Sequence, residues 1–321
     1  MTETQAPLVE SREVSVHYSR WVGSRRRTVY ALDDFSIAVH PGETVGLVGE
    51  SGCGKSTAGR ALLGAVKPVK GQVLFAGKDV TDLSRRGWRA MRKHVQMIFQ
   101  DPYSALNPKL KVGTSIAEPF LVHTHKRGAE LDTAVAELLE TVGMPAGAAD
   151  KYPHAFSGGQ RQRIVIARAL ALHPGFVVAD EATAALDVSI QAQIVNLLVE
   201  LKDTAGLAYL FISHNLAVVR HVSDRVAIMY AGHLMELAAS SDLYDNPTHP
   251  YSQALLSAVP VPDPSRRSRR TPLTGDLPSP MDPPEGCRFH SRCPLAEERC
   301  RQERPPLTLR SQGHYVACWV N

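Results

Sequence analysis

The 321-residue sequence lacks long hydrophobic runs, a signal-peptide core and a large excess of charge. No segment approaches the roughly 18 consecutive apolar residues that a transmembrane helix needs. Because the first ten residues are polar, we expect the chain to stay in the cytoplasm and to reach a membrane only through partners. A formal net charge of +4 is too small to argue for nucleic acid as a partner.

Cysteine is also scarce, with five in the chain and none between Cys53 and the last 35 residues. The remaining four lie in that final stretch: Cys287, Cys293, Cys300 and Cys318. Their spacing matches no tight C-x-x-C zinc pair, although in a reducing compartment such a group favours a metal site over disulfides. Two alternatives stay open from the spacing: a zinc or [4Fe–4S] site, or plain buried thiols.

A glycine-rich segment, residues 49–57, follows an apolar run and precedes a helix-compatible one. Its sequence, GESGCGKST, fits the P-loop pattern G-x-x-x-x-G-K-[ST] in the required strand, loop and helix setting. Glycines let backbone N–H groups converge and the helix N-terminus adds positive potential, so a nucleotide phosphate is the expected occupant. A glycine-rich turn without chemical function is the alternative. The predicted nucleotide-binding residues of this loop are Gly49, Ser51, Gly52, Cys53, Gly54, Lys55, Ser56 and Thr57.

Two side chains of the loop have separate expected roles. Lys55 is expected to reach the terminal phosphates, and the Ser56 hydroxyl to bind Mg²⁺, with Thr57 a weaker candidate.

Polar residues end two buried strands farther along the chain. The apolar run 176–179 places Asp180 and Glu181 at a strand's end, where parallel α/β sheets have their ligand crevice. Asp180 is a candidate Mg²⁺ ligand, and Glu181 is a candidate to polarise the attacking water. His214 follows the run 208–212 in the same way, although a lone histidine is more often structural.

A Ser-Gly-Gly turn at residues 157–159 opens a helix that runs to about residue 172. Ser157 fits the N-cap position, while Gly158 and Gly159 leave N–H groups bare at a positive helix end. The turn is therefore predicted to be an anion site, with an ordinary capped helix as the alternative.

The rest of the chain indicates how these motifs are arranged. Residues 8–18 and 31–39 predict an antiparallel strand pair joined by a basic loop at 20–27. Gln100 ends a buried strand, and residues 101–172 are mainly helical. After about residue 258, prolines and arginines predict an extended, hydrated linker that leads to the cysteines.

Taken in order, these motifs resemble those of the nucleotide-binding subunit of ABC transporters. The resemblance covers about residues 8–258 and rests on the ordered set: residues 49–57, Gln100, Ser157-Gly158-Gly159-Gln160, Asp180-Glu181, Ala185-Leu186-Asp187 and His214. It implies an α/β P-loop core with an antiparallel β edge and an inserted helical subdomain, at about 101–172. The domain division that follows is 1–258 for the cassette and 259–321 for the linker and tail.

The resemblance also implies an ATPase and its site residues. Lys55, Glu181 and His214 would be catalytic, and Mg²⁺ would be held by Ser56, Gln100 and Asp180. Each ATP would lie between the P-loop of one subunit and the helix of a second subunit that begins at Ser157, Gly158, Gly159 and Gln160. Tyr18 matches an aromatic that stacks on adenine in this family, whereas a strand tyrosine more commonly faces the core.

Three longer segments look like the ATPase of oligopeptide, dipeptide and nickel importers: FQDPYSALNP at 99–108, NPTHPY at 246–251 and GCRFHSRCP at 286–294. That resemblance implies that Cys287, Cys293, Cys300 and Cys318 hold a [4Fe–4S] cluster. It also implies a peripheral protein at the cytoplasmic face of the membrane. Its partners would be a second ABC ATPase, two transmembrane permeases and an extracytoplasmic solute-binding protein, with no nucleic acid.

Two positions depart from the family pattern: Ala182 stands where proline is common, and Phe156 where leucine is usual. Glu181 is retained, so we expect hydrolysis to survive. A soluble ABC ATPase of the translation or DNA-repair kind is the alternative from another class. An importer for nickel or another small solute and an iron or zinc sensor are further alternatives. The first is disfavoured because the chain has one cassette and only residues 101–156 separate Gln100 from Ser157.

Overall fold

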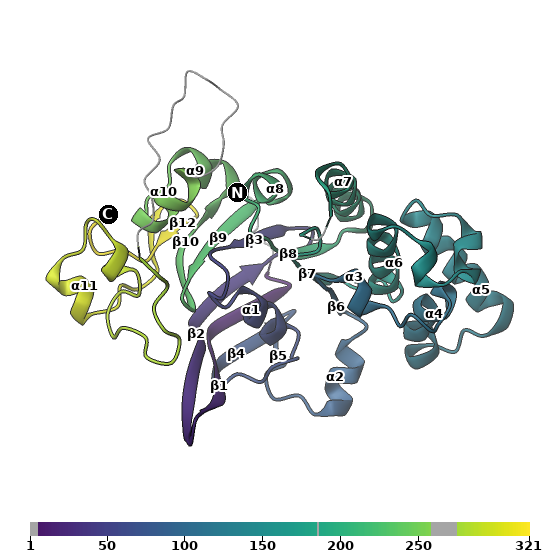
Figure 1. The fold of residues 1–321 in the computed structure, drawn as a ribbon, viewed down its shortest axis with the longest axis horizontal. Helices are drawn as coiled ribbons and strands as arrows, with labels where there is room; N and C mark the ends of the chain where they lie inside the picture. The colour runs from purple at the N-terminus through teal and green to yellow at the C-terminus, as the bar shows by residue number, and fades with distance from the viewer. Residues whose placement is uncertain (1–5, 185, 258–274) are drawn as a thin grey trace. The chain divides into compact units, whose positions relative to one another are not determined.

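The computed structural model describes residues 6–184, 186–257 and 275–321 (Figure 1). Ala185 of the predicted 185–187 motif and most of the proline-rich linker lie outside these ranges. The chain divides into two compact units. The first comprises Met1–Leu8, His40–Glu43 and Leu83–Phe211, and the second comprises Val9–Val39, Thr44–Asp82 and Ile212–Asn321.

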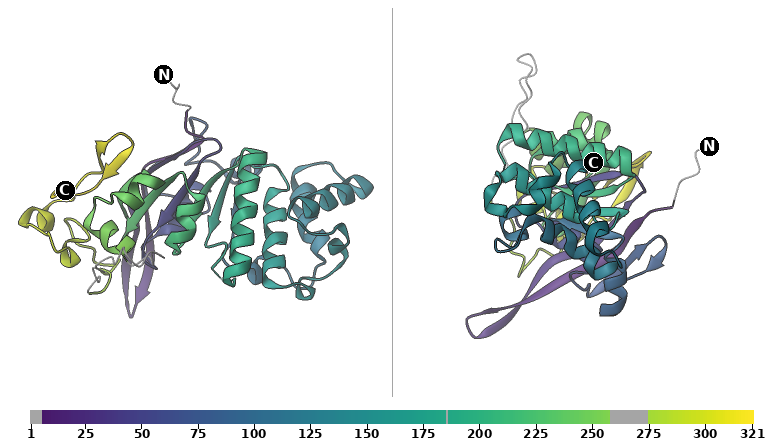
Figure 2. Two further views of the ribbon diagram at one scale, coloured as in Figure 1. Left: turned by 90° about the horizontal axis from the view of Figure 1, so that it is seen from above. Right: turned by 90° about the vertical axis from the view of Figure 1, so that its right-hand side faces the viewer.

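The second unit contains an antiparallel sheet of four strands in the order β2-β1-β4-β5. The strands are β1 (Val9–Val22), β2 (Arg25–Val39), β4 (Lys70–Phe75) and β5 (Lys78–Asp79). The predicted antiparallel pair is confirmed, with Val9 opposite Val39 and Val22 opposite Arg25. The predicted loop at 20–27 is wrong, because both strands continue to a tight turn at Gly23, whose φ is +61°. Figure 2 shows this hairpin in purple.

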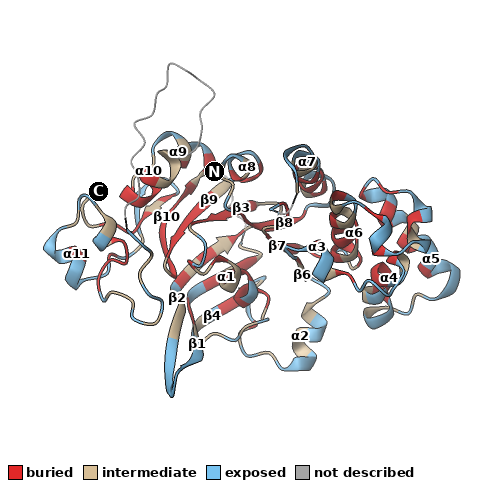
Figure 3. Cartoon of the chain, in the orientation of Figure 1, coloured by how far each residue is buried: buried red, intermediate tan, exposed pale blue. Residues whose placement is uncertain are grey.

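A second group of strands in this unit lies in the order β11-β12-β10-β9-β3. β3 (Thr44–Val48) runs parallel to β9 (Arg225–Tyr230), which pairs antiparallel with β10 (His233–Ala239). β9 and β10 are buried almost throughout and form the core of the unit (Figure 3). The remaining elements are α1 (Lys55–Leu62), α8 (Leu216–Val222), α9 (Ser240–Asp245), α10 (Pro250–Ser257), η3 (His290–Arg292), α11 (Glu298–Gln302), β11 (Thr308–Ser311) and β12 (His314–Val316).

The C-terminal segment 275–321 is built into the second unit. β12 pairs with β10, placing Val316 opposite Glu236. Arg288 is only 3% exposed, pairs with Asp33 of β2 and donates a 2.9 Å hydrogen bond from Nη1 to the Ala231 carbonyl. These contacts join the tail to β10, to β2 and to the turn between β9 and β10.

The first unit has a short parallel sheet and a group of helices. β6 (Val95–Ile98) pairs in parallel with β7 (Phe176–Asp180), and β8 (Ala208–Ile212) lies on the other side of β7. The helices are α2 (Arg85–Met91), α3 (Pro102–Ala105), α4 (Val112–His123), α5 (Gly128–Thr141), η1 (Ala146–Asp150), η2 (Pro153–Ala155), α6 (Gly158–Leu170) and α7 (Val188–Ala205). The predicted apolar stripe of α5, which includes Leu138 and Leu139, is buried. Within the described ranges, no helix is long and apolar enough to cross a membrane.

Candidate functional site

The glycine-rich loop between β3 and α1 has the backbone geometry of a phosphate cradle. Gly49, Gly52 and Gly54 have φ values of +156°, +81° and +107°, which L-residues rarely adopt. A Cβ at Gly49 would lie 2.1 Å from the Met229 carbonyl oxygen, and one at Gly54 would lie 2.3 Å from that of Ala31. Glycine is therefore required at these two positions both for the conformation and for the space.

Lys55 begins α1 with its side chain buried and its ammonium held inside the loop. Nζ donates to the carbonyl oxygens of Gly49, at 2.8 Å, and of Glu50, at 2.9 Å. The helix N-cap, Gly54, makes no side-chain capping hydrogen bond. An uncapped helix N-terminus beside a lysine ammonium suits a phosphate group, so the residues present fit a nucleotide.

The other loop residues differ in their surroundings. Cys53 is buried, and this burial raises the pKa of its thiol, so the side chain stays protonated at neutral pH. Its backbone N–H donates to the Glu50 carbonyl at 3.2 Å. Ser51 and Gly52 are exposed, whereas Ser56 and Thr57 are half-buried.

Tyr18 and His214 lie in the same unit as this loop. Tyr18 sits on β1 opposite Val29 and is 37% exposed, so its ring does not face the core. His214 is exposed in the turn between β8 and α8. That turn is fixed by the Asn215 side chain, whose Oδ1 accepts from the backbone N–H groups of Ala217 and Val218.

In the first unit, the structure brings Gln100 and Glu181 together. Both follow the carboxyl ends of the neighbouring parallel strands β6 and β7. Gln100 Nε2 donates a 2.8 Å hydrogen bond to Glu181 Oε2. Asp180 is buried at the end of β7, and Glu181 has a φ of +48°, unusual for a residue other than glycine. The Gln100 amide, predicted to bind Mg²⁺, thus orients the Glu181 carboxylate here.

The predicted anion site at the start of α6 is a capped helix end. Ser157 Oγ accepts from the Gln160 N–H at 3.3 Å, and Gln160 Oε1 accepts from the Ser157 N–H at 3.0 Å. A Cβ at Gly159 would lie 2.3 Å from Ile190 Cγ2 of α7, whereas one at Gly158 would make only an ordinary contact. Gly159 therefore has a packing reason to be glycine, in addition to any role toward an anion.

The predicted [4Fe–4S] cluster is wrong. Among the residues that the structure describes, no group of three or more His, Cys, Asp or Glu side chains is arranged to hold a metal ion. Cys287, Cys300 and Cys318 are buried, and Cys293 is half-buried. Burial raises the pKa of the Cys287 thiol to about 11 and also raises that of Cys293. None of the four forms a disulfide in the part of the chain that the structure describes.

The tail contributes a contact to the phosphate loop that the sequence analysis missed. Arg292 Nη1 donates to both carboxylate oxygens of Glu50, each at 3.0 Å. The partners lie 242 positions apart, so no local pattern signals their contact. Arg292 does, however, fall within the segment 286–294 that carries the family resemblance.

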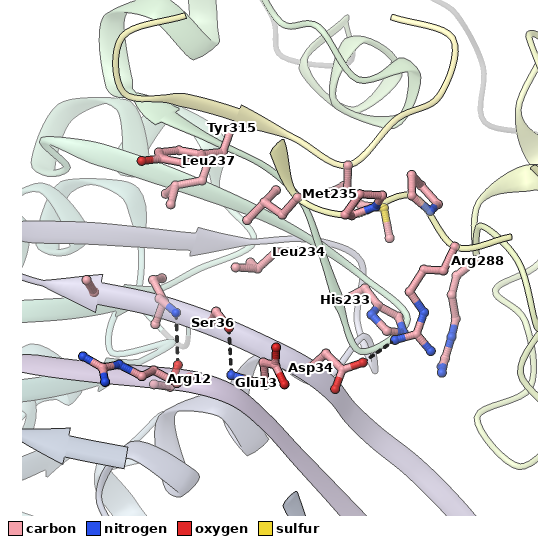
Figure 4. A pocket seen from close by; sticks show the side chains of 18 of the residues that line it. Arg12, Glu13, Asp34, Ser36, His233, Leu234, Met235, Leu237, Arg288 and Tyr315 are labelled. Atoms are coloured by element: carbon pink, nitrogen blue, oxygen red, sulfur yellow. Dashed lines mark hydrogen bonds and ion pairs between the residues drawn. The ribbon is translucent and has the colours of Figure 1, made fainter. Parts of the chain in front are cut away.

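A cavity of about 760 Å³ lies elsewhere in the second unit, between β1, β2, β10 and the tail (Figure 4). Leu234, Met235 and Leu237 of β10 face Arg12 and Glu13 of β1 across it. None of the predicted nucleotide-binding residues lines this cavity. The nucleotide assignment therefore rests on the geometry of the loop.

Comparison with known proteins supports the same assignment. The sequence profile described as "ABC transporter" matches residues 32–184, and "Oligopeptide/dipeptide transporter, C-terminal region" matches residues 235–300. The oligopeptide transport ATP-binding protein AppF of Bacillus subtilis is 50% identical over 320 residues, covering 98% of this chain and 97% of that protein. A putative peptide import ATP-binding protein of Brucella ovis is 49% identical over 318 residues, covering 99% and 98%.

Solved structures show the same fold. The ATP-binding cassette MJ0796, in a dimeric post-hydrolysis state bound to ADP and Pi, matches with a TM-score of 0.65 and 28% identity, covering 72% of this chain and 98% of that one. The cbiO1 component of a Clostridium perfringens ABC transporter matches with a TM-score of 0.67 and 27% identity, covering 75% and 92%. The chain therefore belongs to the ATP-binding proteins of the ABC transporter family.

Proposed function

We propose that this chain is the ATP-hydrolysing subunit of an ABC importer for peptides. The observation that carries the proposal is a phosphate loop of the required geometry in a chain that matches peptide-transport ATP-binding proteins over nearly its whole length. The names of those relatives specify peptides and oligopeptides, and one of them specifies import. Peptide is therefore the cargo class that we assign.

The phosphate loop and the residues at the strand ends have different roles in ATP hydrolysis. Residues 49–57 bind the phosphates of ATP, with Lys55 on the terminal ones, and Tyr18 stacks on adenine. Ser56, Gln100 and Asp180 supply oxygen ligands for Mg²⁺, which neutralises charge on the phosphates when bound. Glu181 orients and deprotonates the attacking water, and His214 donates to the γ-phosphate. The hydrogen bond from Gln100 supports the role of Glu181, because it fixes a carboxylate oxygen.

A second ATPase subunit completes each site in this proposal. Its Ser157, Gly158, Gly159 and Gln160 approach the ATP that is bound by the phosphate loop of the first. Two permease subunits and an extracytoplasmic solute-binding protein are the other partners, and the assembly holds the chain at the cytoplasmic face of the membrane. The division into a cassette at 1–258 and a linker with tail at 259–321 is part of the same proposal.

Isolation of the intact assembly tests this function. Membranes from cells that produce the tagged protein are solubilised gently, and everything that accompanies it is identified by mass spectrometry. We expect two multi-span permeases, a second cassette ATPase and a solute-binding protein. Recovery of ribosomal or DNA-repair proteins instead, or of no partner, would contradict the transport assignment while leaving the ATPase chemistry untouched.

A further inference from the structure

The C-terminal tail reaches the phosphate loop through one buried arginine. The Arg292 side chain, at the end of η3, is only 5% exposed, and the Glu50 side chain that it meets is 26% exposed. Besides its two contacts with the Glu50 carboxylate, Arg292 Nη1 donates to Tyr230 Oη at 3.3 Å. An ion pair withdrawn from water in this way is more sensitive to the loss of one partner than a surface pair.

The backbone groups of Glu50 link its carboxylate to the rest of the phosphate loop. Its carbonyl oxygen accepts from Lys55 Nζ at 2.9 Å and from the Cys53 N–H at 3.2 Å. Its own N–H donates to Tyr251 Oη at 3.1 Å. The carboxylate, the carbonyl and the N–H of one residue are therefore all engaged, and two of these groups are held by elements outside the loop.

The part of the tail that presents Arg292 is itself firmly packed. Phe289 is buried, and its ring lies 5.3 Å from the rings of both Tyr230 and Tyr251. Arg288 pairs with Asp33 at the other end of the same short segment. Because Tyr230 and Tyr251 contact both the tail and the surroundings of Glu50, the tail, the β9 end and the loop form one packed group.

We propose that Arg292 is a positioning residue for ATP binding, through which the C-terminal tail fixes the conformation of the phosphate loop. By holding the Glu50 carboxylate, Arg292 keeps the Glu50 carbonyl where it supports the Lys55 ammonium, so the loop is preorganised for phosphate. The inference rests on the proposed binding of ATP by this loop. It extends that function by making nucleotide affinity depend on a segment far from the cassette motifs.

A double-mutant cycle tests the contact. Nucleotide affinity of the purified full chain is measured with a fluorescent ATP analogue for the wild type, R292Q, E50Q and the double variant. We expect each single substitution to weaken binding roughly five- to tenfold, within the range typical of coupled sites. The double variant is expected to bind no more weakly than either single one, because both remove the same interaction.

Amide hydrogen exchange without nucleotide gives a second readout that does not depend on ATP binding. We expect R292Q and E50Q to speed exchange at residues 50–57 and to leave β9 and β10 protected. R292K, which keeps the charge but loses the planar donor group, is expected to restore part of the affinity. This variant also tests the contact if R292Q does not fold.

R304Q is the matched control. Arg304 also lies in the tail and pairs with the second unit's β2 through Asp34 at 2.7 Å, but it does not contact the loop. Wild-type affinity and loop exchange are expected for R304Q. Wild-type values for R292Q, or independent effects of R292Q and E50Q, would overturn the inference. A wild-type chain that does not bind the ATP analogue at all would instead overturn the proposed function.

Discussion

Two glycine-rich helix N-termini in the described part of the chain use glycine differently. At the start of α1, Gly49 and Gly54 adopt positive φ angles and stand against neighbouring carbonyl oxygens, with no side chain capping the helix. At the start of α6, the helix is capped by its own Ser157 and Gln160, and Gly159 is pressed against a side chain of α7. The N-terminus of α1 therefore has no side chain that caps its backbone N–H groups. The N-terminus of α6 is capped by its own side chains and packs against α7.

In our proposal the two helix ends also act at different stages. The α1 end has what it needs to bind phosphate within one chain, including the ammonium of Lys55. At the α6 end the serine oxygen accepts the Gln160 N–H in a capping box. In our proposal this end contributes when another subunit brings a nucleotide to it. Substitutions at α1 should therefore affect binding by the isolated chain, and substitutions at α6 its stability or its assembly.

The substitution with the largest expected effect, at Glu181, should nearly abolish hydrolysis at the end of β7 without changing ATP binding at α1. Glu181→Gln removes the base but keeps the shape of the side chain, so we expect steady-state turnover of the assembled transporter to fall about a hundredfold or more. ATP affinity should not change, and a closed ATPase dimer should accumulate. Turnover and dimer formation, by size-exclusion chromatography with ATP, are the measurements. Undiminished turnover would remove Glu181 from its assigned role.

The next effect tests the α1 end directly. Lys55→Met keeps the buried alkyl stem but removes the ammonium. Since a hydrogen bond to a charged group contributes about 1.5–3 kcal/mol, we expect ATP binding to weaken roughly tenfold to hundredfold. Binding is measured by fluorescence titration, and circular dichroism checks that the variant is folded. A folded K55M chain with wild-type affinity would contradict the assignment of the loop.

A matched glycine pair tests the packed character of the α6 end. Gly159→Ala places a methyl group against Ile190, and overpacking of this kind costs about 1–3 kcal/mol, partly offset by the better helix propensity of alanine. Urea unfolding should show G159A to be destabilised and G158A to be neutral or slightly stabilised. When Ile190 is shortened to alanine, G159A should cost less stability, so G159A/I190A should differ from I190A by less than G159A differs from the wild type. Equal effects of G158A and G159A would contradict the packing explanation.

The smallest effect concerns the cap. Ser157→Ala removes the acceptor for the Gln160 N–H and should cost about 1 kcal/mol of stability, as is usual for a lost N-cap. Affinity of the isolated chain for ATP should stay at the wild-type value, in contrast to K55M. If S157A weakened ATP binding by the monomeric chain, the proposed division of labour between α1 and α6 would be wrong.

Features that depend on neighbouring residues could be predicted from the sequence. The phosphate loop is set by consecutive residues between a buried strand and a helix, and the Ser157 cap by residues three positions apart. Asp180 and Glu181 could be placed at a strand end because the apolar run before them is fully buried. In each case the physical cause lies within about one turn or one strand of the residue concerned.

Features that depend on distant residues were missed or wrong. Four cysteines in a short segment do not show whether the fold arranges their side chains to hold a metal ion, and among the described residues no group of three or more His, Cys, Asp or Glu side chains is arranged in that way. The contact between Arg292 and Glu50 joins positions 242 residues apart. One local feature was also wrong: the ends of β1 and β2 next to the turn at Gly23 were predicted as a loop, because their arginines are exposed and no buried face produces an alternating pattern.

The central claim, that ATP hydrolysis by this chain drives peptide import, is tested most directly by peptide uptake. Cells that carry Glu181→Gln in place of the wild-type chain are given a mixture of isotope-labelled peptides of two to five residues. The account predicts that uptake of at least one peptide class is lost while the protein is present at its normal level and binds ATP. Unchanged uptake of all the peptides in cells whose purified E181Q protein no longer turns over ATP would contradict it.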